Sequence, residues 1–182
     1  MTSESNPSPP LTLGERPKIV IERTYRAAVR DLWELWTTKD GFESWWGPEG
    51  FRVEVHTIEA RPGGLLQYDM IAATPEMVAA MESMSQPPSH GVTARFSELV
   101  LLTRVAITSV IDFLPGVEAY ESTIGVDFFD VGAGATTMGG SSGACTRMVI
   151  SLDPMHTEDF TRMATMGMTS QIGKLDRRFE SA

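Results

Sequence analysis

The chain has 182 residues, of which 42% are hydrophobic and 21% are charged. This length and balance are typical of one globular domain with its own core, and they exclude a chain that is disordered throughout. The formal net charge of -9 repels phosphate backbones, and no basic patch interrupts it, so nucleic acid is not an expected partner.

The cysteine content and the apolar runs bear on whether the protein is secreted, membrane-bound or cytoplasmic. Cys145 is alone, which excludes an internal disulfide, and its position at the start of a strand predicts a small core residue. Residues 1–16 are rich in Ser and Pro, lack the features of a signal peptide, and are predicted to be a flexible tail before a single domain, 17–182. The longest apolar run, 99–114, carries two charges and is too short for a membrane span. A cytoplasmic protein is expected.

The first half of the chain predicts strands, short helices and one helical insertion. In order, the expected elements are a strand within 17–25 at a sheet edge, a helix over about 28–37, a short helix capped by Asp40 that runs towards Trp46, strands over 51–60 and 65–72, and an insertion (74–90) whose helix has Thr74 as cap and Pro75 first. The turn Arg61-Pro62-Gly63-Gly64 joins the two strands of a hairpin, because its glycines tolerate positive φ.

The second half predicts a run of strands followed by one long helix. The expected strands begin at about Gly91 and continue over 104–113, 117–130 and 144–152, with a Gly- and Ser-rich loop at 131–143. An apolar stripe at three- and four-residue spacing predicts a helix over 153–179, with Asp153 or Thr157 as its cap. The order favours an α+β helix-grip fold: a curved antiparallel sheet of about six to seven strands wrapped around the last helix, with two short helices after the first strand.

Several motifs resemble those of a known family. They are Arg23-Thr24-Tyr25-Arg26-Ala27, Leu35-Trp36-Thr37, Trp45-Trp46-Gly47-Pro48-Glu49-Gly50-Phe51, the Arg-Pro-Gly-Gly turn and Met166-Gly167-Met168. Together they resemble the START-like (SRPBCC) helix-grip superfamily, in the branch named for activators of the ninety-kilodalton heat-shock-protein ATPase. The resemblance implies a cavity for apolar or amphipathic molecules between sheet and helix, but relatives on this scaffold differ widely in function.

Three features depart from that family pattern. Residue 28 is Ala where many relatives have Pro, and residue 172 is Ile where many carry a cavity-facing Trp, so the pocket wall is expected to be less aromatic. The segment 73–90 replaces what is often a short turn.

The expected site is a cavity for a lipid-like or polyketide-like ligand, with no cofactor. The predicted ligand-binding residues are Trp45, Trp46, Tyr68, Met70, Phe96, Tyr120, Phe160, Met163 and Gly167. Apolar burial supplies affinity in this hypothesis, and Tyr68, Arg95 or Tyr120 orients the ligand.

Two features have alternative structural interpretations. Trp45 and Trp46 either line the ligand opening or anchor the second helix on the sheet, with one of them buried and the other nearer the opening. The stripe Met77, Met81 and Met84 is either an adaptable lid or an ordinary packing face, and the packing face is the more frequent outcome.

Catalytic and metal sites are not expected. No spacing in the sequence forces an acid and a base together, either among the histidines His56, His90 and His156 or among the strand carboxylates Glu59, Asp69, Glu98 and Asp112. His56 is predicted to face solvent, and His156 is predicted to bond a backbone group. No metal-ligand spacing is present.

Two further functions stay open beside ligand binding. One is a co-chaperone-type module that stimulates a heat-shock-protein ATPase, and the other is a cyclase or hydratase that uses the pocket carboxylates. The edge strand and the insertion also offer surfaces for a homodimer.

Overall fold

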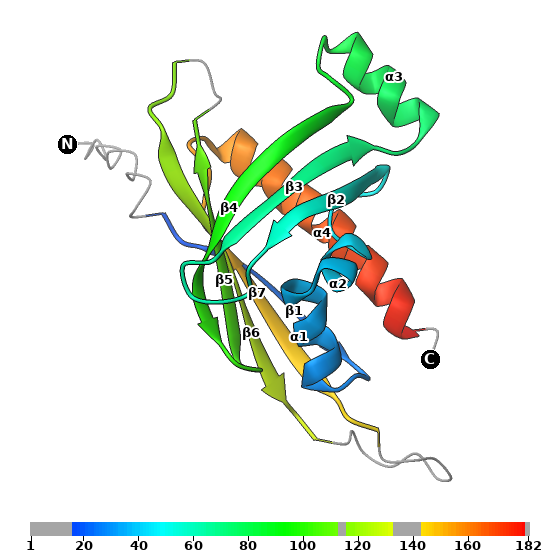
Figure 1. The fold of residues 1–182 in the computed structure, drawn as a ribbon, viewed down its shortest axis with the longest axis vertical. Helices are drawn as coiled ribbons and strands as arrows, with labels where there is room; N and C mark the ends of the chain where they lie inside the picture. The colour runs from blue at the N-terminus through cyan, green and yellow to red at the C-terminus, as the bar shows by residue number, and fades with distance from the viewer. Residues whose placement is uncertain (1–15, 113–115, 133–142, 181–182) are drawn as a thin grey trace, which may run out of the picture.

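The computed structural model describes residues 16–112, 116–132 and 143–180, whose strands and helices follow the predicted order (Figure 1). The predicted tail up to residue 15 and residues 133–142 of the predicted loop lie outside the described residues. No helix in the described part of the chain is long and apolar enough to cross a membrane.

The described chain contains seven strands and four helices. The strands are β1 (Ile19–Tyr25), β2 (Phe51–Ile58), β3 (Leu65–Ala72), β4 (Ser89–Val100), β5 (Arg104–Ile111), β6 (Tyr120–Asp130) and β7 (Thr146–Leu152). The helices are α1 (Val29–Thr37), α2 (Lys39–Glu43), α3 (Pro75–Ser83) and α4 (Glu158–Glu180).

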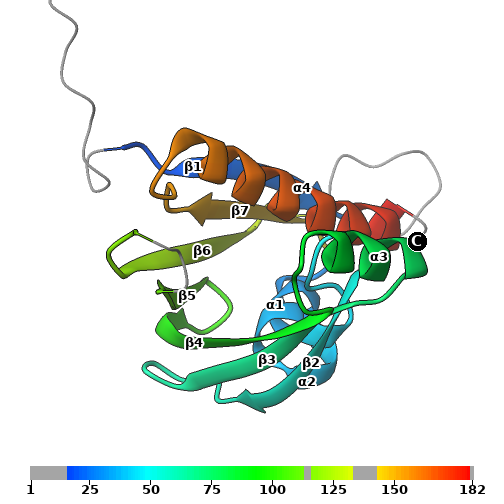
Figure 2. The same cartoon turned by 90° about the horizontal axis from the view of Figure 1, so that it is seen from above.

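All seven strands belong to one antiparallel sheet in the order β1-β7-β6-β5-β4-β3-β2. Consecutive strands from β2 to β7 are neighbours, and β1 closes the order as an edge strand beside β7. Figure 2 shows the sheet curling from β2 round to β1, with α4 lying over the arm formed by β1 and β7. The predicted α+β helix-grip fold is therefore confirmed.

The core fills the concave side of this sheet. Alternate residues of each strand point inward, so that cross-strand partners such as Val105 and Val126, or Phe128 and Met148, are buried together. Helix α1 buries its stripe against them, and the Trp33 ring meets the Phe128 ring edge-on at 5.9 Å. Burial of these aromatic and aliphatic side chains is the main force that holds α1 and α2 in the curl of the sheet.

Two predicted helix starts are wrong. Asp153 does not begin α4: one carboxylate oxygen accepts the Thr123 amide at 2.9 Å and the other pairs with Lys18 at 2.6 Å, which keeps this segment on the sheet. The alternative cap is correct, since the Thr157 hydroxyl accepts the Phe160 amide. In α2 the cap is Thr38 rather than Asp40.

Several strand ends differ from the prediction because pairing, not composition, sets them. Strand β6 begins at residue 120 rather than 117, since the pair Ile111–Tyr120 is the last one it makes with β5. Strands β2 and β5 stop two residues early, β7 starts two residues late, and β4 begins at Ser89. Cys145 precedes β7 and is half-exposed, so its prediction as a core residue is wrong.

Candidate functional site

The C-terminal half of α4 is fixed by the loop that follows the two tryptophans. The Gly47 amide donates to the buried Gln171 side chain at 3.0 Å, and the Lys174 ammonium donates to the carbonyls of Gly47 and Phe51. Burial lowers the pKa of Lys174, because the charged form loses solvation. Beside these contacts, Leu175 is fully buried in the core. This half of α4 has no room for a ligand beneath it.

Both tryptophans are buried, with exposed fractions of 1% for Trp45 and 5% for Trp46. Trp45 donates its indole N–H to the Leu35 carbonyl at 3.0 Å, and Trp46 donates its own to the Tyr68 hydroxyl at 3.1 Å. The expectation that one of them lies nearer an opening is wrong, and the contacts agree with the anchoring interpretation. Burial raises the pKa of Tyr68 to about 12, although the hydrogen bond from Trp46 partly opposes this shift.

The N-terminal half of α4 is exposed on the side that continues the buried stripe. Phe160 is 36% exposed and Met163 is 54% exposed, and Ala164, one turn before the buried Met168, is exposed as well. A Cβ atom placed on Gly167 would meet nothing within 4 Å. The helix therefore changes at about Gly167 from a packed element to an uncovered one.

The concave face of the sheet is uncovered in the corresponding region. The inward-facing residues that stay half-exposed there are Met70, Val92, Ser109, Ile111, Tyr120 and Ser122. They are aligned across four strands by pairs such as Tyr68–Val92, Ser109–Ser122 and Ile111–Tyr120. Phe96 and Ile107, one step further along the strands, are buried. The outer part of the concave face is thus an apolar surface with a few hydroxyl groups.

A polar corner lies where β6 meets the start of α4. The Tyr120 hydroxyl accepts the His156 amide at 3.3 Å and lies 3.2 Å from Nδ1 of the same residue. The Phe160 ring packs on the imidazole, with ring centroids 4.3 Å apart. His156 contacts a side chain rather than the predicted backbone group. Sequence reasoning missed Ser109, Ser122 and His156 as site residues, although the alternation of β6 places Ser122 on the same face as Tyr120.

Two of the four proposed carboxylates point away from this region. Asp69 lies on the convex face, 3.0 Å from the exposed His56, and the prediction that His56 faces solvent is confirmed. Glu98 also lies on the convex face, 2.7 Å from Arg104. Glu59 pairs with Arg61 at the hairpin turn, and Asp112 is exposed beyond β5. Asp69 and Glu98 therefore cannot supply an acid and a base to the concave face.

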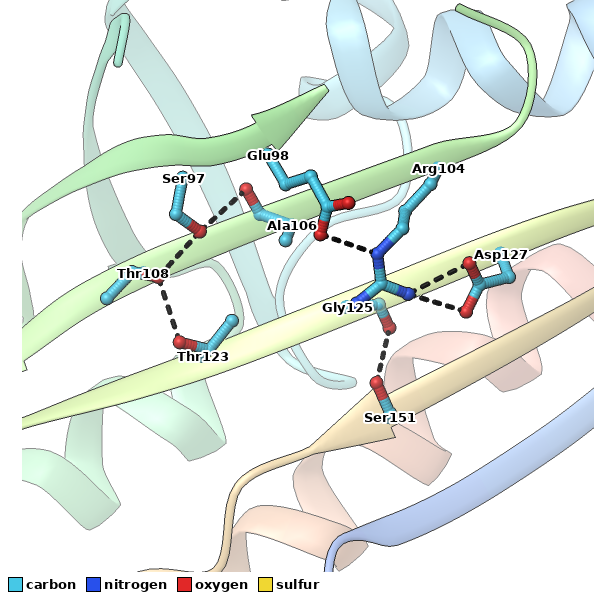
Figure 3. Close-up of polar contacts among 9 residues, drawn as sticks. All are labelled: Ser97, Glu98, Arg104, Ala106, Thr108, Thr123, Gly125, Asp127 and Ser151. Atoms are coloured by element: carbon cyan, nitrogen blue, oxygen red, sulfur yellow. Dashed lines mark hydrogen bonds and ion pairs between the residues drawn. The ribbon is translucent and has the colours of Figure 1, made fainter. Parts of the chain in front are cut away.

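The convex face carries an ordered polar network instead (Figure 3). Arg104 makes a bidentate contact with Asp127 and a single one with Glu98, and these hydrogen bonds raise its pKa. Its guanidinium crosses Gly125, where a Cβ would come within 3.4 Å of Nη2. Thr108 links the hydroxyls of Ser97 and Thr123 across the strands. All these groups satisfy one another, which is typical of a structural surface.

Arg95, proposed to orient a ligand, belongs to this convex face as well. It pairs with Glu121 at 3.0 Å, and its cross-strand partner is Thr108. It does not reach the concave side.

The helical insertion α3 connects β3 to β4 at one end of the sheet (Figure 1). Its cap and first residue are Thr74 and Pro75, as predicted. None of its residues belongs to the core, but Met77 and Met81 are half-buried, so both the packing-face and the lid interpretation of the Met stripe stay predictions. Met77 contacts Gly50, and Met84 just after the helix is 60% exposed.

A separate hollow of about 690 Å³ lies between the α1–α2 turn and the end of α4. Its lining includes Asp31, Glu34, Lys39, Asp40 and Arg178, and Arg178 donates to the Ser44 hydroxyl at its wall. This hollow is open and charged, which does not suit an apolar ligand. Among the described residues, no group of three or more His, Cys, Asp or Glu could hold a metal ion.

The fold and the uncovered concave face define an α+β helix-grip domain. The family model described as "Activator of Hsp90 ATPase homolog 1-like protein" matches residues 26–180, and the chain belongs to this family. No curated protein matches the chain.

Solved structures agree with this assignment at the level of the fold. The AHSA1 protein from Silicibacter pomeroyi has a TM-score of 0.63 at 16% identity, over 88% of this chain and 96% of that one. A protein from Arthrobacter aurescens has a TM-score of 0.63 at 20% identity, over 91% and 87%. A protein from Chromobacterium violaceum has a TM-score of 0.62 at 19% identity, over 90% and 97%.

Proposed function

We propose that the chain binds a small apolar or amphipathic molecule between the outer part of the concave face and the N-terminal half of α4. The observation that carries this proposal is that both surfaces stay uncovered. Phe160 and Ala164 on the helix, and Val92 and Ile111 on the sheet, are inward-facing apolar groups that stay at least partly exposed in the described part of the chain. Apolar surface left in water at a concave site is a source of binding free energy of about 25 cal/mol per Å².

The predicted ligand residues divide into two sets under this proposal. Met70, Tyr120, Phe160, Met163 and Gly167 lie in or beside the uncovered region and are the residues that contact the ligand. Trp45, Trp46, Tyr68 and Phe96 lie in the core and form the wall that closes its inner end.

Gly167 offers a direct test, because a larger side chain there occupies the space left for the ligand. Gly167→Leu is expected to weaken binding of a lipid and aromatic polyketide panel by about tenfold or more, measured by native mass spectrometry and fluorescence titration. The substitution removes a glycine from a helix, so the free energy of unfolding should rise by about 0.5–1 kcal/mol. Loss of binding then cannot be attributed to loss of structure.

Gly173→Leu is the matched control. It makes the same chemical change in the same helix, but a Cβ at Gly173 meets only the Arg177 side chain at 3.8 Å. Its stability should rise similarly while binding stays as in the wild type. The proposal is wrong if no member of the panel binds the wild type, or if both variants bind equally well.

Stimulation of a chaperone ATPase is the alternative that the family description raises. It needs an exposed docking surface and does not need the uncovered concave face. In an ATPase assay with purified ninety-kilodalton heat-shock protein, this alternative predicts stimulation that Gly167→Leu leaves unchanged.

A further inference from the structure

The polar and apolar groups of the uncovered region are not mixed. The hydroxyls of Ser109, Ser122 and Tyr120 lie on the adjacent strands β5 and β6, and His156 completes the group from the start of α4. Away from this corner, the uncovered inward-facing residues are mainly apolar, with the exposed His90 beside Met70 as the polar exception. A site with one polar end and one apolar side is built for a molecule with the same division.

The hydrogen bonds at this corner leave a proton donor unused. The Tyr120 oxygen already accepts the His156 amide. If Tyr120 gives its own proton to Nδ1, then Nε2 carries a hydrogen that has no partner among the described residues. If Nδ1 carries the hydrogen and donates to Tyr120, the hydroxyl proton is left, with only the Met155 sulfur 3.9 Å away as a weak acceptor. Each tautomer therefore presents a donor.

We infer that the ligand of this site is amphipathic and carries a carboxylate head group, which accepts a hydrogen bond from whichever of Tyr120 and His156 holds the unused proton, while its apolar part lies along Phe160, Ala164 and Gly167. This inference rests on the proposed ligand-binding function. The Phe160 ring touches the imidazole, so the junction of head and tail falls at that contact. From Phe160 to Gly167 the helix rises about 10 Å, enough for a medium-length alkyl chain.

A set of single-chain molecules that differ only in the head group tests this inference. Dodecanoic acid, dodecanol and dodecylamine, each below its micelle concentration, should bind in that order of falling affinity in a fluorescence titration. The acid is expected to bind at least about tenfold more tightly than the amine, since the amine offers donors only. The net charge of -9 favours the amine at long range, so a preference for the acid must come from the local site.

Two variants test whether a preference for the acid comes from Tyr120 and His156. Tyr120→Phe and His156→Ala should each lower the affinity for the acid by about tenfold and leave the affinity for dodecanol within about twofold. His56→Ala is the control, because His56 pairs with Asp69 on the convex face. Circular dichroism of each variant checks that the fold is kept, and His156→Phe, which keeps a ring against Phe160 but has no donor, replaces His156→Ala if that variant unfolds.

The possible failures are distinguishable. Equal affinity for acid, alcohol and amine, or tighter binding of the amine, overturns the inference about the head group and leaves ligand binding intact. A preference for the acid that survives both Tyr120→Phe and the substitution of His156 overturns the location. Binding of none of the three, together with none of the wider panel, overturns the inference and the proposed function alike.

Discussion

The hydrogen bond between Trp46 and Tyr68 allows a prediction that combines packing with pH. Tyr68→Phe keeps the ring and its contact with Phe42, whose centroid is 5.4 Å away, but removes the only hydroxyl that accepts the Trp46 indole N–H. That N–H is buried and would have no acceptor in the variant. Leaving a buried donor unpaired costs about 1–3 kcal/mol, so Tyr68→Phe should lower the free energy of unfolding by that amount at pH 8.

The size of the effect should change with pH, because burial raises the pKa of Tyr68 from 10.0 to about 12. Below pH 10 the phenol is neutral in both the folded and the unfolded states, and its contribution to stability is fully present. Between pH 10 and 12 the unfolded chain releases the proton while the folded protein keeps it, so the wild type loses stability as the pH rises. At pH 11 the loss amounts to about 1.4 kcal/mol.

Phenylalanine does not titrate, so the difference between wild type and Tyr68→Phe should narrow by about 1.4 kcal/mol from pH 8 to pH 11. Urea denaturation followed by tryptophan fluorescence measures both free energies, and all other titrating groups cancel in the difference. A constant difference across this range would refute the assignment of Tyr68 as a buried, neutral acceptor. So would a variant as stable as the wild type at pH 8.

Three further substitutions probe the frame around the site by urea denaturation. Arg104→Met should lower the free energy of unfolding by about 1 kcal/mol, with a smaller effect at high salt, because its ion pairs are partly exposed and therefore screened; an effect independent of salt would contradict this. Gln171→Leu should lower the free energy of unfolding by about 1–3 kcal/mol, because it leaves the buried Gly47 amide without an acceptor. Ser170→Ala removes an exposed hydrogen bond to the Glu49 amide and should lower it by less than about 0.5 kcal/mol. Thr157→Ala should lower the free energy of unfolding by about 1 kcal/mol, because it removes the cap of α4. If neither the stability nor the helical content changed, Thr157 would not be the cap.

The strands, helices and turns were largely predictable from the sequence, because they depend on local patterns. Alternation over β3 placed Leu66 and Tyr68 on one face, and the structure buries both. The Arg61–Gly64 turn is where it was expected, with Gly63 at φ 74° and Gly64 so close to the Glu59 carbonyl that no Cβ would fit.

The candidate site was only partly predictable, because it depends on non-local register. Tyr120 and His156 meet across 36 residues, and their contact requires both the pairing of β6 with β7 and a start of α4 later than the one predicted. The predicted start at Asp153 would have placed His156 inside the helix. Arg95 is a different case, because the alternation of β4 alone places it opposite the buried Ala94 and Phe96 and therefore on the convex face.

The division of α4 into two halves links the fold to the proposed function. An amphipathic helix is stabilised most when its whole apolar stripe is buried. In α4 the apolar residues of the stripe are buried by the described chain only from Met168 onward. The loop after Trp46 holds the C-terminal half with hydrogen bonds at Gly47 and Phe51, which fixes the helix axis without closing the other end. The N-terminal half consequently keeps apolar side chains exposed. Under the proposed function, a ligand would remove the exposed surface of Phe160 from water. Under the proposed function, affinity comes from the apolar surfaces, whereas the unused donor of the corner at Tyr120 contributes discrimination among ligands.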